Sequence, residues 1–195
     1  MALKRKTLLL AAVLVVQCLC IGWLILRYEC VVSLGTEVRF PCQAFDPYDA
    51  FRGRYLQTNV RDGCFIKTME MKGLSFRELK LFAKVEPLED GTGLWHVTDV
   101  AKEPSADGLW LLPERVYGND PLPELEDEKV KCYWAEVVFP SKLFVNEKIA
   151  PQADEILAKN TDNAVAVYRV WKHRVVLMDV EIDGKPIREL VKAKL

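Results

Sequence analysis

The chain has few of the residues from which enzymes usually build a catalytic centre. It contains only two histidines, His96 and His173, among 195 residues, and each lies within or beside a strand-like run. No Gly-x-Ser-x-Gly elbow, His-Glu-x-x-His pair or phosphate-binding glycine loop occurs. Neither a Cys-x-x-Cys pair nor a histidine pair offers zinc ligands, so no metal or cofactor is expected. The sequence predicts no catalytic residue, and a non-enzymatic role is favoured.

The chain also lacks a dominant charge. Its 27 Lys and Arg residues are balanced by 28 Asp and Glu residues, which gives a formal net charge of −1. The basic residues are dispersed, so a nucleic acid is not an expected partner. The acidic run at residues 124–128 lacks the ordered spacing of a calcium loop, which favours a solvated loop over a cation site.

Charge is absent altogether from residues 7–26, a run of twenty residues that follows Lys4, Arg5 and Lys6. At about 1.5 Å per helical residue this run spans roughly 30 Å, the thickness of the hydrocarbon core of a bilayer. Helices of soluble proteins are seldom apolar all round over this length, so the run predicts a transmembrane helix. Trp23 and Tyr28 near its end suit the aromatic belt of a membrane interface.

The distribution of basic residues predicts the direction of this helix. Three basic residues precede it and only Arg27 follows closely, which by the positive-inside rule leaves the N-terminus in the cytoplasm. A cleaved signal peptide fits less well, because its apolar stretch has about 7–15 residues and ends at a small-x-small site that is missing here. The sequence predicts a cytoplasmic tail at residues 1–6, a signal anchor at 7–26 and an extracytoplasmic domain at 28–195.

Four cysteines, Cys30, Cys42, Cys64 and Cys132, fall in the part of the chain expected outside the cytoplasm. An oxidising compartment permits disulfides there, and four thiols allow three pairings. A bridge between Cys42 and Cys64 would close a loop of about twenty residues and stabilise the fold by roughly 3 kcal/mol. Burial of the thiols as small apolar side chains is the open alternative.

Short apolar or alternating runs separated by turn residues dominate the domain. The first expected strand, residues 36–40, ends at Pro41, which has no N–H group for a ladder. An Asp-Gly pair at residues 62–63 lies between the runs 55–60 and 64–67 and predicts a β-hairpin. Further strands are expected at residues 79–86, 94–97, 109–112, 130–134, 164–171 and 175–182.

The clearest helix outside the apolar run begins near Pro151, a residue tolerated in a first helical turn, and ends at Lys159. The predicted fold class is therefore mainly β (α+β). An N-terminal transmembrane helix precedes one antiparallel β-rich domain, which carries one short helix near residues 151–159.

Residues 36–60 read TEVRFPCQAFDPYDAFRGRYLQTNV and resemble the bacterial GDYXXLXY family of membrane-anchored proteins. In that family a strand leads through a loop of the type DPRD and an arginine to the naming motif. The loop and its approach match at Asp46, Pro47, Asp49, Arg52, Gly53 and Tyr55. The motif differs at Arg54, Thr58 and Val60.

A second stretch, residues 143–151, resembles the aromatic and acidic segment before the short helix of that family, with Phe144 and Glu147 as the matching residues. The resemblance implies a location in a bacterial inner or cell membrane and a multi-spanning membrane protein as partner. It implies no settled biochemical activity. From the residues alone, Arg52 either braces the loop through Asp46 or Asp49 or recognises an anion.

The favoured function is that of a membrane-anchored, extracytoplasmic binding or assembly protein acting with a multi-spanning membrane partner. The alternative is a membrane-tethered hydrolase or a binder of a small ligand of the cell envelope. That alternative predicts a concave pocket that gathers Arg52, Tyr55, His96 or His173 with a carboxylate. The favoured function predicts that these groups lie scattered or paired with one another.

Overall fold

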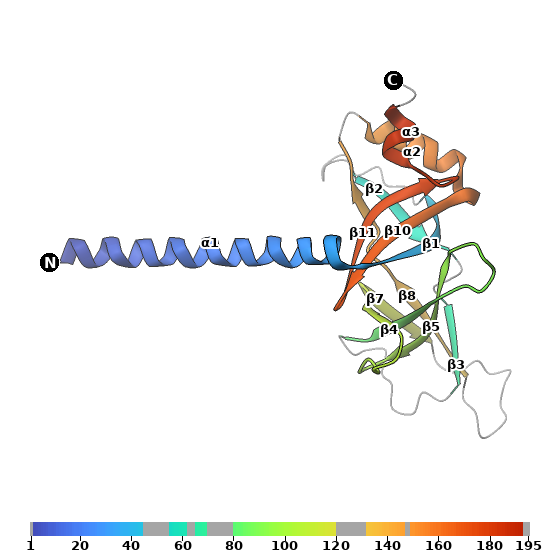
Figure 1. Cartoon of the computed structure of the whole chain (residues 1–195), viewed down its shortest axis with the longest axis horizontal. Helices are drawn as coiled ribbons and strands as arrows, with labels where there is room; N and C mark the ends of the chain where they lie inside the picture. Colours follow the sequence, from blue (N-terminus) through green and yellow to red (C-terminus); the bar gives the residue numbers. More distant parts are fainter. Residues whose placement is uncertain are drawn as a thin grey trace.

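A computed structural model describes residues 2–44, 55–61, 65–69, 80–119, 132–146 and 149–192. The N-terminal helix α1 (Ala2–Leu34) projects as a single rod from a β-rich domain (Figure 1). Its side chains from Leu10 to Leu26 are exposed, and it is long and apolar enough to cross a membrane or act as a signal sequence. The helix continues eight residues beyond the uncharged run and ends at Leu34.

The domain is a mixed, mostly antiparallel β structure with short helices, which confirms the predicted fold class. Its larger sheet has the order β5-β4-β6-β11-β10-β1-β2-β9, with β12 paired to β11, and its smaller sheet has the order β3-β8-β7. The strands are β1 (Thr36–Ala44), β2 (Tyr55–Val60), β3 (Phe65–Met69), β4 (Phe82–Pro87), β5 (Trp95–Ala101), β6 (Leu109–Leu112), β7 (Arg115–Asn119), β8 (Cys132–Val138), β9 (Lys142–Phe144), β10 (Ala164–Trp171), β11 (His173–Ile182) and β12 (Lys185–Pro186).

The hairpin of β10 and β11 forms the centre of the larger sheet. Strand β10 pairs antiparallel with β1, whereas β11 pairs parallel with β6 through His173 and Arg174. The strands expected at residues 79–86 and 94–97 correspond to β4 and β5, which pair antiparallel. The strand predicted at residues 130–134 corresponds to β8, which continues to Val138.

The prediction that the first strand ends at Pro41 is wrong, because β1 continues to Ala44. Pro41 lies where β1 passes from pairing with β10 to pairing with β2. Its carbonyl accepts the N–H of Arg61 at 2.8 Å, and the ladder to β2 begins only at the next residue, Cys42. A proline fits at this position because no ladder donor is required there.

The predicted hairpin across residues 62–63 is also wrong. Strand β2 pairs with β1 and β9 in the larger sheet, whereas β3 pairs with β8 in the smaller sheet. An Asp-Gly pair favours a tight turn locally, but pairing with strands distant in the sequence decides where β2 and β3 lie. The two residues themselves fall outside the described part of the chain.

Helix α2 (Ala150–Lys159) confirms the predicted helix, with Pro151 in its first turn. Ala153, Ile156 and Leu157 recur at helical spacing and are buried against the core. Asn160 ends the helix, since its side-chain amide donates to the carbonyl of Ile156 at 2.7 Å. A short η2 turn (Thr161–Asn163) follows it, and a second short helix that was not predicted, α3 (Ile187–Lys192), packs beside α2 (Figure 1).

The core forms around three aromatic side chains from separate segments. The Phe40 ring lies 4.6 Å from the Phe139 ring and 6.0 Å from the Tyr168 ring, measured between centroids. All three residues are buried, and the Tyr168 hydroxyl donates to the carbonyl of Pro140 at 3.1 Å. The cluster joins β1, β10 and the segment after β8, which brings the distant parts of the chain together.

Asp179 on β11 gives the fold a pH dependence. Burial raises its pKa above the usual 3.8, although the N–H of Val180 donates to its carboxylate and Arg188 lies nearby. The raised pKa means that Asp179 favours the folded state below the unfolded-state pKa, and this contribution is lost as the pH rises through the folded-state pKa. The stability gained by Asp179→Asn should therefore grow as the pH is raised from about 3 to 7, as chemical denaturation would show. The exposed Asp107→Asn serves as control, and an equal pH response of both variants would contradict the expectation.

Candidate functional site

A single residue, Gly35, separates the end of α1 from the start of β1. Its N–H donates to the carbonyl of Val31 at 3.0 Å, and the side chain of Val31 is only 1% exposed. Helix α1 contacts both β10 and β11 at this point. The helix is thus packed onto the sheet at its C-terminal end, and no flexible linker joins the two.

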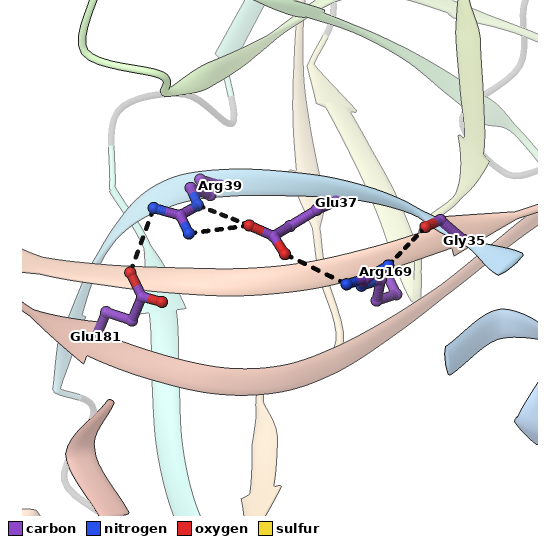
Figure 2. A network of polar contacts seen from close by, with 5 residues as sticks. All are labelled: Gly35, Glu37, Arg39, Arg169 and Glu181. Carbon is purple, nitrogen blue, oxygen red and sulfur yellow. Dashed lines mark hydrogen bonds and ion pairs between the residues drawn. The ribbon is translucent and has the colours of Figure 1, made fainter. Parts of the chain in front are cut away.

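A chain of polar contacts on the surface of the sheet holds this junction (Figure 2). Arg169 on β10 donates to the carbonyl of Gly35 at 3.0 Å, and its guanidinium lies 3.5 Å from Glu37. Arg39 contacts Glu37 at 2.9 Å and reaches Glu181 on β11 at 3.4 Å. These side chains are partly exposed, so each ion pair contributes at most about 1 kcal/mol. The contact between Arg169 and Gly35 joins β10 to the junction, and the ion pairs join β1 to β10 and β11 beside it.

A cavity of about 670 Å³ opens beside this junction, between α1 and the β10–β11 turn. Its lining combines positively charged and apolar side chains, and none of its described lining residues is acidic. The residues that line it are Leu24, Arg27, Tyr28, Val31, Phe82, Leu112, Lys172, His173, Arg174, Val175 and Val176.

Three cations of the lining, Arg27, Lys172 and Arg174, form no ion pair with a carboxylate in the part of the chain that the structure describes. Arg27 lies 5.9 Å from the centre of the Trp23 ring, and Lys172 lies 4.5 Å from the centre of the Trp171 ring. Such contacts orient the cations but leave their charge uncompensated. The cavity is therefore suited to an anion.

The turn that carries two of the lining residues has an uncommon backbone. Lys172 and His173 both adopt positive φ, at 46° and 65°, in the tight turn between Trp171 on β10 and its paired residue Arg174 on β11. Turns of this kind favour Asn-Gly, because other side chains cost about 1–2 kcal/mol per residue in the left-handed region. The chain places a lysine and a histidine there despite this cost.

His173 is held in place by contacts on two sides. Its Nδ1 lies 3.0 Å from the carbonyl oxygen of Trp110, and because a carbonyl only accepts, Nδ1 carries the hydrogen. Its ring meets the Phe82 ring edge to face at 5.2 Å. These contacts indicate that His173 forms part of the wall of the cavity. Neither partner is a carboxylate that would orient it as a catalytic base.

Of the residues in the predicted binding motif, Tyr55 and Phe144 fall in the described part. They are opposite one another on β2 and β9, with ring centroids 6.3 Å apart, and the ammonium of Lys142 lies 5.1 Å from the centre of the Tyr55 ring. Phe144 is 73% exposed. The remaining motif residues lie outside the described residues: Asp46, Pro47, Asp49, Arg52, Gly53 and Glu147.

Cys42 is fully buried in the core, and burial raises the pKa of its thiol to about 12. Its predicted disulfide partner Cys64 lies outside the described residues, so the bridge stays a prediction. Because the thiolate is the reactive form, we expect iodoacetamide near pH 8 to leave Cys42 unlabelled in the folded protein. Unfolding without reductant should expose a reactive Cys42 if the thiol is free, whereas a bridge would require reductant first. Peptide mass spectrometry distinguishes these cases, and labelling of Cys42 in the folded protein would contradict its burial.

The pocket that a tethered hydrolase requires is not formed by the described candidates. His173 lines the cavity, whereas Tyr55 lies on β2 against β9 and His96 lies on β5. No group of three or more His, Cys, Asp or Glu side chains able to hold a metal occurs among the residues described. Within the described ranges, the titratable side chains that line the cavity, Tyr28, Lys172 and His173, form no hydrogen bond with one another.

No family model, curated protein or solved structure matches the chain. The resemblance to the GDYXXLXY family therefore stays a prediction.

The basic cavity was not predicted from the sequence. Two signals pointed to part of it: the charged turn Lys172-His173-Arg174 between two apolar runs, and Arg27 at the end of the uncharged run.

Proposed function

We propose that the chain is a single-pass membrane protein with its N-terminus in the cytoplasm and its β domain outside. In this proposal the domain is a non-enzymatic binding or assembly module that acts with a multi-spanning partner in the same bilayer. The observation that carries the proposal is the junction at Gly35, where an apolar helix able to span a bilayer passes into a packed sheet within one residue.

Such a junction limits where the domain can be. A domain fixed to the end of a membrane helix stays close to the bilayer, so a weak contact with a membrane partner benefits from a high effective concentration. The side chains of α1 from Leu10 to Leu26 are exposed, so they are available to pack against another transmembrane helix. The resemblance to the GDYXXLXY family supports the same kind of partner.

Crosslinking in the membrane tests this function. A photoreactive amino acid at Val15 or Leu19, both exposed on α1, should crosslink a multi-spanning protein when the full chain is expressed at its native level. Co-purification in a mild detergent should recover the same protein. Recovery of the chain alone by both methods would contradict the proposal.

A linker insertion tests whether the rigid junction matters. Ten Gly and Ser residues inserted between Leu34 and Gly35 keep the tether but release the domain from its fixed orientation, so recovery of the partner should fall. The same linker inserted in the exposed β4–β5 turn, between Gly91 and Thr92, is the matched control and should leave recovery unchanged. Equal recovery with both insertions would exclude a role for the fixed orientation.

The cavity beside α1 supports the second candidate, a binder of a small ligand of the cell envelope. Its cations are unpaired within the described part of the chain, and its walls are otherwise largely apolar. A hydrolase receives no such support, because the described titratable side chains of the cavity, Tyr28, Lys172 and His173, form no hydrogen bond with one another. Purified chain that hydrolysed envelope esters or peptides would reverse this preference.

A further inference from the structure

The cavity lies at a defined depth if α1 crosses the membrane as proposed above. Leu24 belongs to the last turn of the uncharged run, which fits the hydrocarbon core, and Arg27 and Val31 belong to the turns that follow. Val31 lies five residues beyond Leu26, or about 7.5 Å along the helix, close to the thickness of the headgroup layer on one side of a bilayer. The cavity therefore extends from the edge of the hydrocarbon through the headgroup layer.

The charges of the lining select the ligand. Arg27, Lys172 and Arg174 face one cavity without a described carboxylate, so they repel one another until an anion is bound. Guanidinium and ammonium groups are the usual partners of phosphate oxygens. The side chains of Leu24, Val31 and Val175 are suited to hydrocarbon. A phosphate joined to acyl chains satisfies both parts of the lining at once.

We propose that this cavity binds the headgroup of an anionic phospholipid from the leaflet that faces the domain. Arg27, Lys172 and Arg174 contact the phosphate, and the first carbons of the acyl chains lie against the apolar lining. A zwitterionic lipid binds more weakly, because its ammonium group is repelled by the same three cations. The left-handed backbone at Lys172 and His173 agrees with this role. Asn-Gly would adopt these positive φ angles at a lower conformational cost, but it would remove the lysine that contacts the phosphate.

Native mass spectrometry of the full chain in detergent micelles measures lipid binding directly. Phosphatidylglycerol should bind more tightly than phosphatidylcholine, and one molecule should be retained per chain. The double variant Lys172→Gln/Arg174→Gln should weaken phosphatidylglycerol binding by about 25-fold, on the order of fivefold for each charge removed near an anionic lipid. Equal binding of the two lipids by the unchanged protein would overturn the proposal.

The matched control removes two cations from the other end of the domain. Lys185 and Lys192 are exposed on β12 and α3, at the opposite end of β11 from the cavity. The variant Lys185→Gln/Lys192→Gln changes the net charge by the same amount and should bind phosphatidylglycerol as the unchanged protein does. An equal loss in both double variants would show a general attraction between charges and would overturn the assignment to the cavity.

A variant that fills the cavity without changing its charge tests whether the lipid binds inside the cavity. Leu112→Trp adds bulk to a partly exposed lining residue and keeps all three cations, so it should weaken retention of phosphatidylglycerol. Undiminished retention by a folded Leu112→Trp chain would overturn the proposal. Glycerol 3-phosphate distinguishes a membrane lipid from a free phosphate ester. It should not displace the lipid, and displacement at comparable concentration would assign the site to a soluble ligand.

Failure of this inference and failure of the proposed function can be told apart. Extraction of membranes with alkaline carbonate shows whether α1 anchors the chain, whatever its lipid preference. An anchored chain without preference for phosphatidylglycerol would overturn only the lipid site. A chain released by carbonate would overturn the membrane anchor, and with it the depth on which the lipid site depends.

Discussion

Phe40→Ala is expected to lower the free energy of unfolding by about 3–5 kcal/mol, the usual cost of removing a buried phenyl ring. Phe40 is fully buried and contacts the rings of Phe139 and Tyr168, so its loss leaves a cavity where β1 meets β10. Chemical denaturation of the full chain in detergent, followed by tryptophan fluorescence, measures the change.

The matched control is Phe144→Ala, because that ring is 73% exposed. Its replacement should alter the free energy of unfolding by no more than about 0.5 kcal/mol. A Phe40→Ala variant that lost less than about 1 kcal/mol would show that the three rings do not form the centre of the core.

Gly35→Ala is expected to destabilise the connection between α1 and the domain by about 2–4 kcal/mol, through overpacking and a lost hydrogen bond. A Cβ atom at this position would overlap the carbonyl oxygen of Val31 and lie 3.2 Å from both Arg169 Cβ and Val170 N. The neighbouring atoms include backbone on two sides, so a change of rotamer cannot relieve the overlap. Chemical denaturation gives the loss of stability, and hydrogen exchange of the amides of β1 shows whether the junction opens.

Gly22→Ala makes the same substitution within α1, where an added Cβ would meet nothing within 4 Å. It should leave the stability of the domain and the exchange of β1 unchanged. Equal behaviour of the two variants would contradict the close packing at Gly35.

The sequence predicted those parts of the fold that are encoded locally. Twenty uncharged residues indicate the long helix wherever the rest of the chain lies, and the apolar runs at 164–171 and 175–182 form the central strands β10 and β11. Helix α2 was predicted from Pro151 and the residues that follow it, which also act within a few turns of one another. Local steric and hydrophobic preferences suffice for these elements.

The sequence failed where partners distant in the chain decide the outcome. Pro41 would end a strand only if the ladder required an N–H donor at that position. Whether it does depends on the residue at which β1 stops pairing with β10 and starts pairing with β2. The Asp-Gly pair at residues 62–63 likewise predicts a hairpin only if the flanking strands pair with each other, whereas β2 and β3 pair with other strands. The basic cavity combines Arg27 with Lys172 and Arg174, which pairing of the strands and docking of α1 bring together. No periodic pattern in the sequence predicts that residues so far apart in the chain line one cavity.

Labelling from outside the membrane tests the central claim, that α1 crosses the bilayer and leaves the β domain on the outer side. Lys6→Cys lies before the uncharged run, and Lys185→Cys is exposed on β12. With a membrane-impermeant maleimide on intact spheroplasts, and the unchanged chain as background, Lys185→Cys should be labelled at once. Lys6→Cys should be labelled only after permeabilisation. Labelling of Lys185→Cys only after permeabilisation, or of Lys6→Cys before it, would contradict the account.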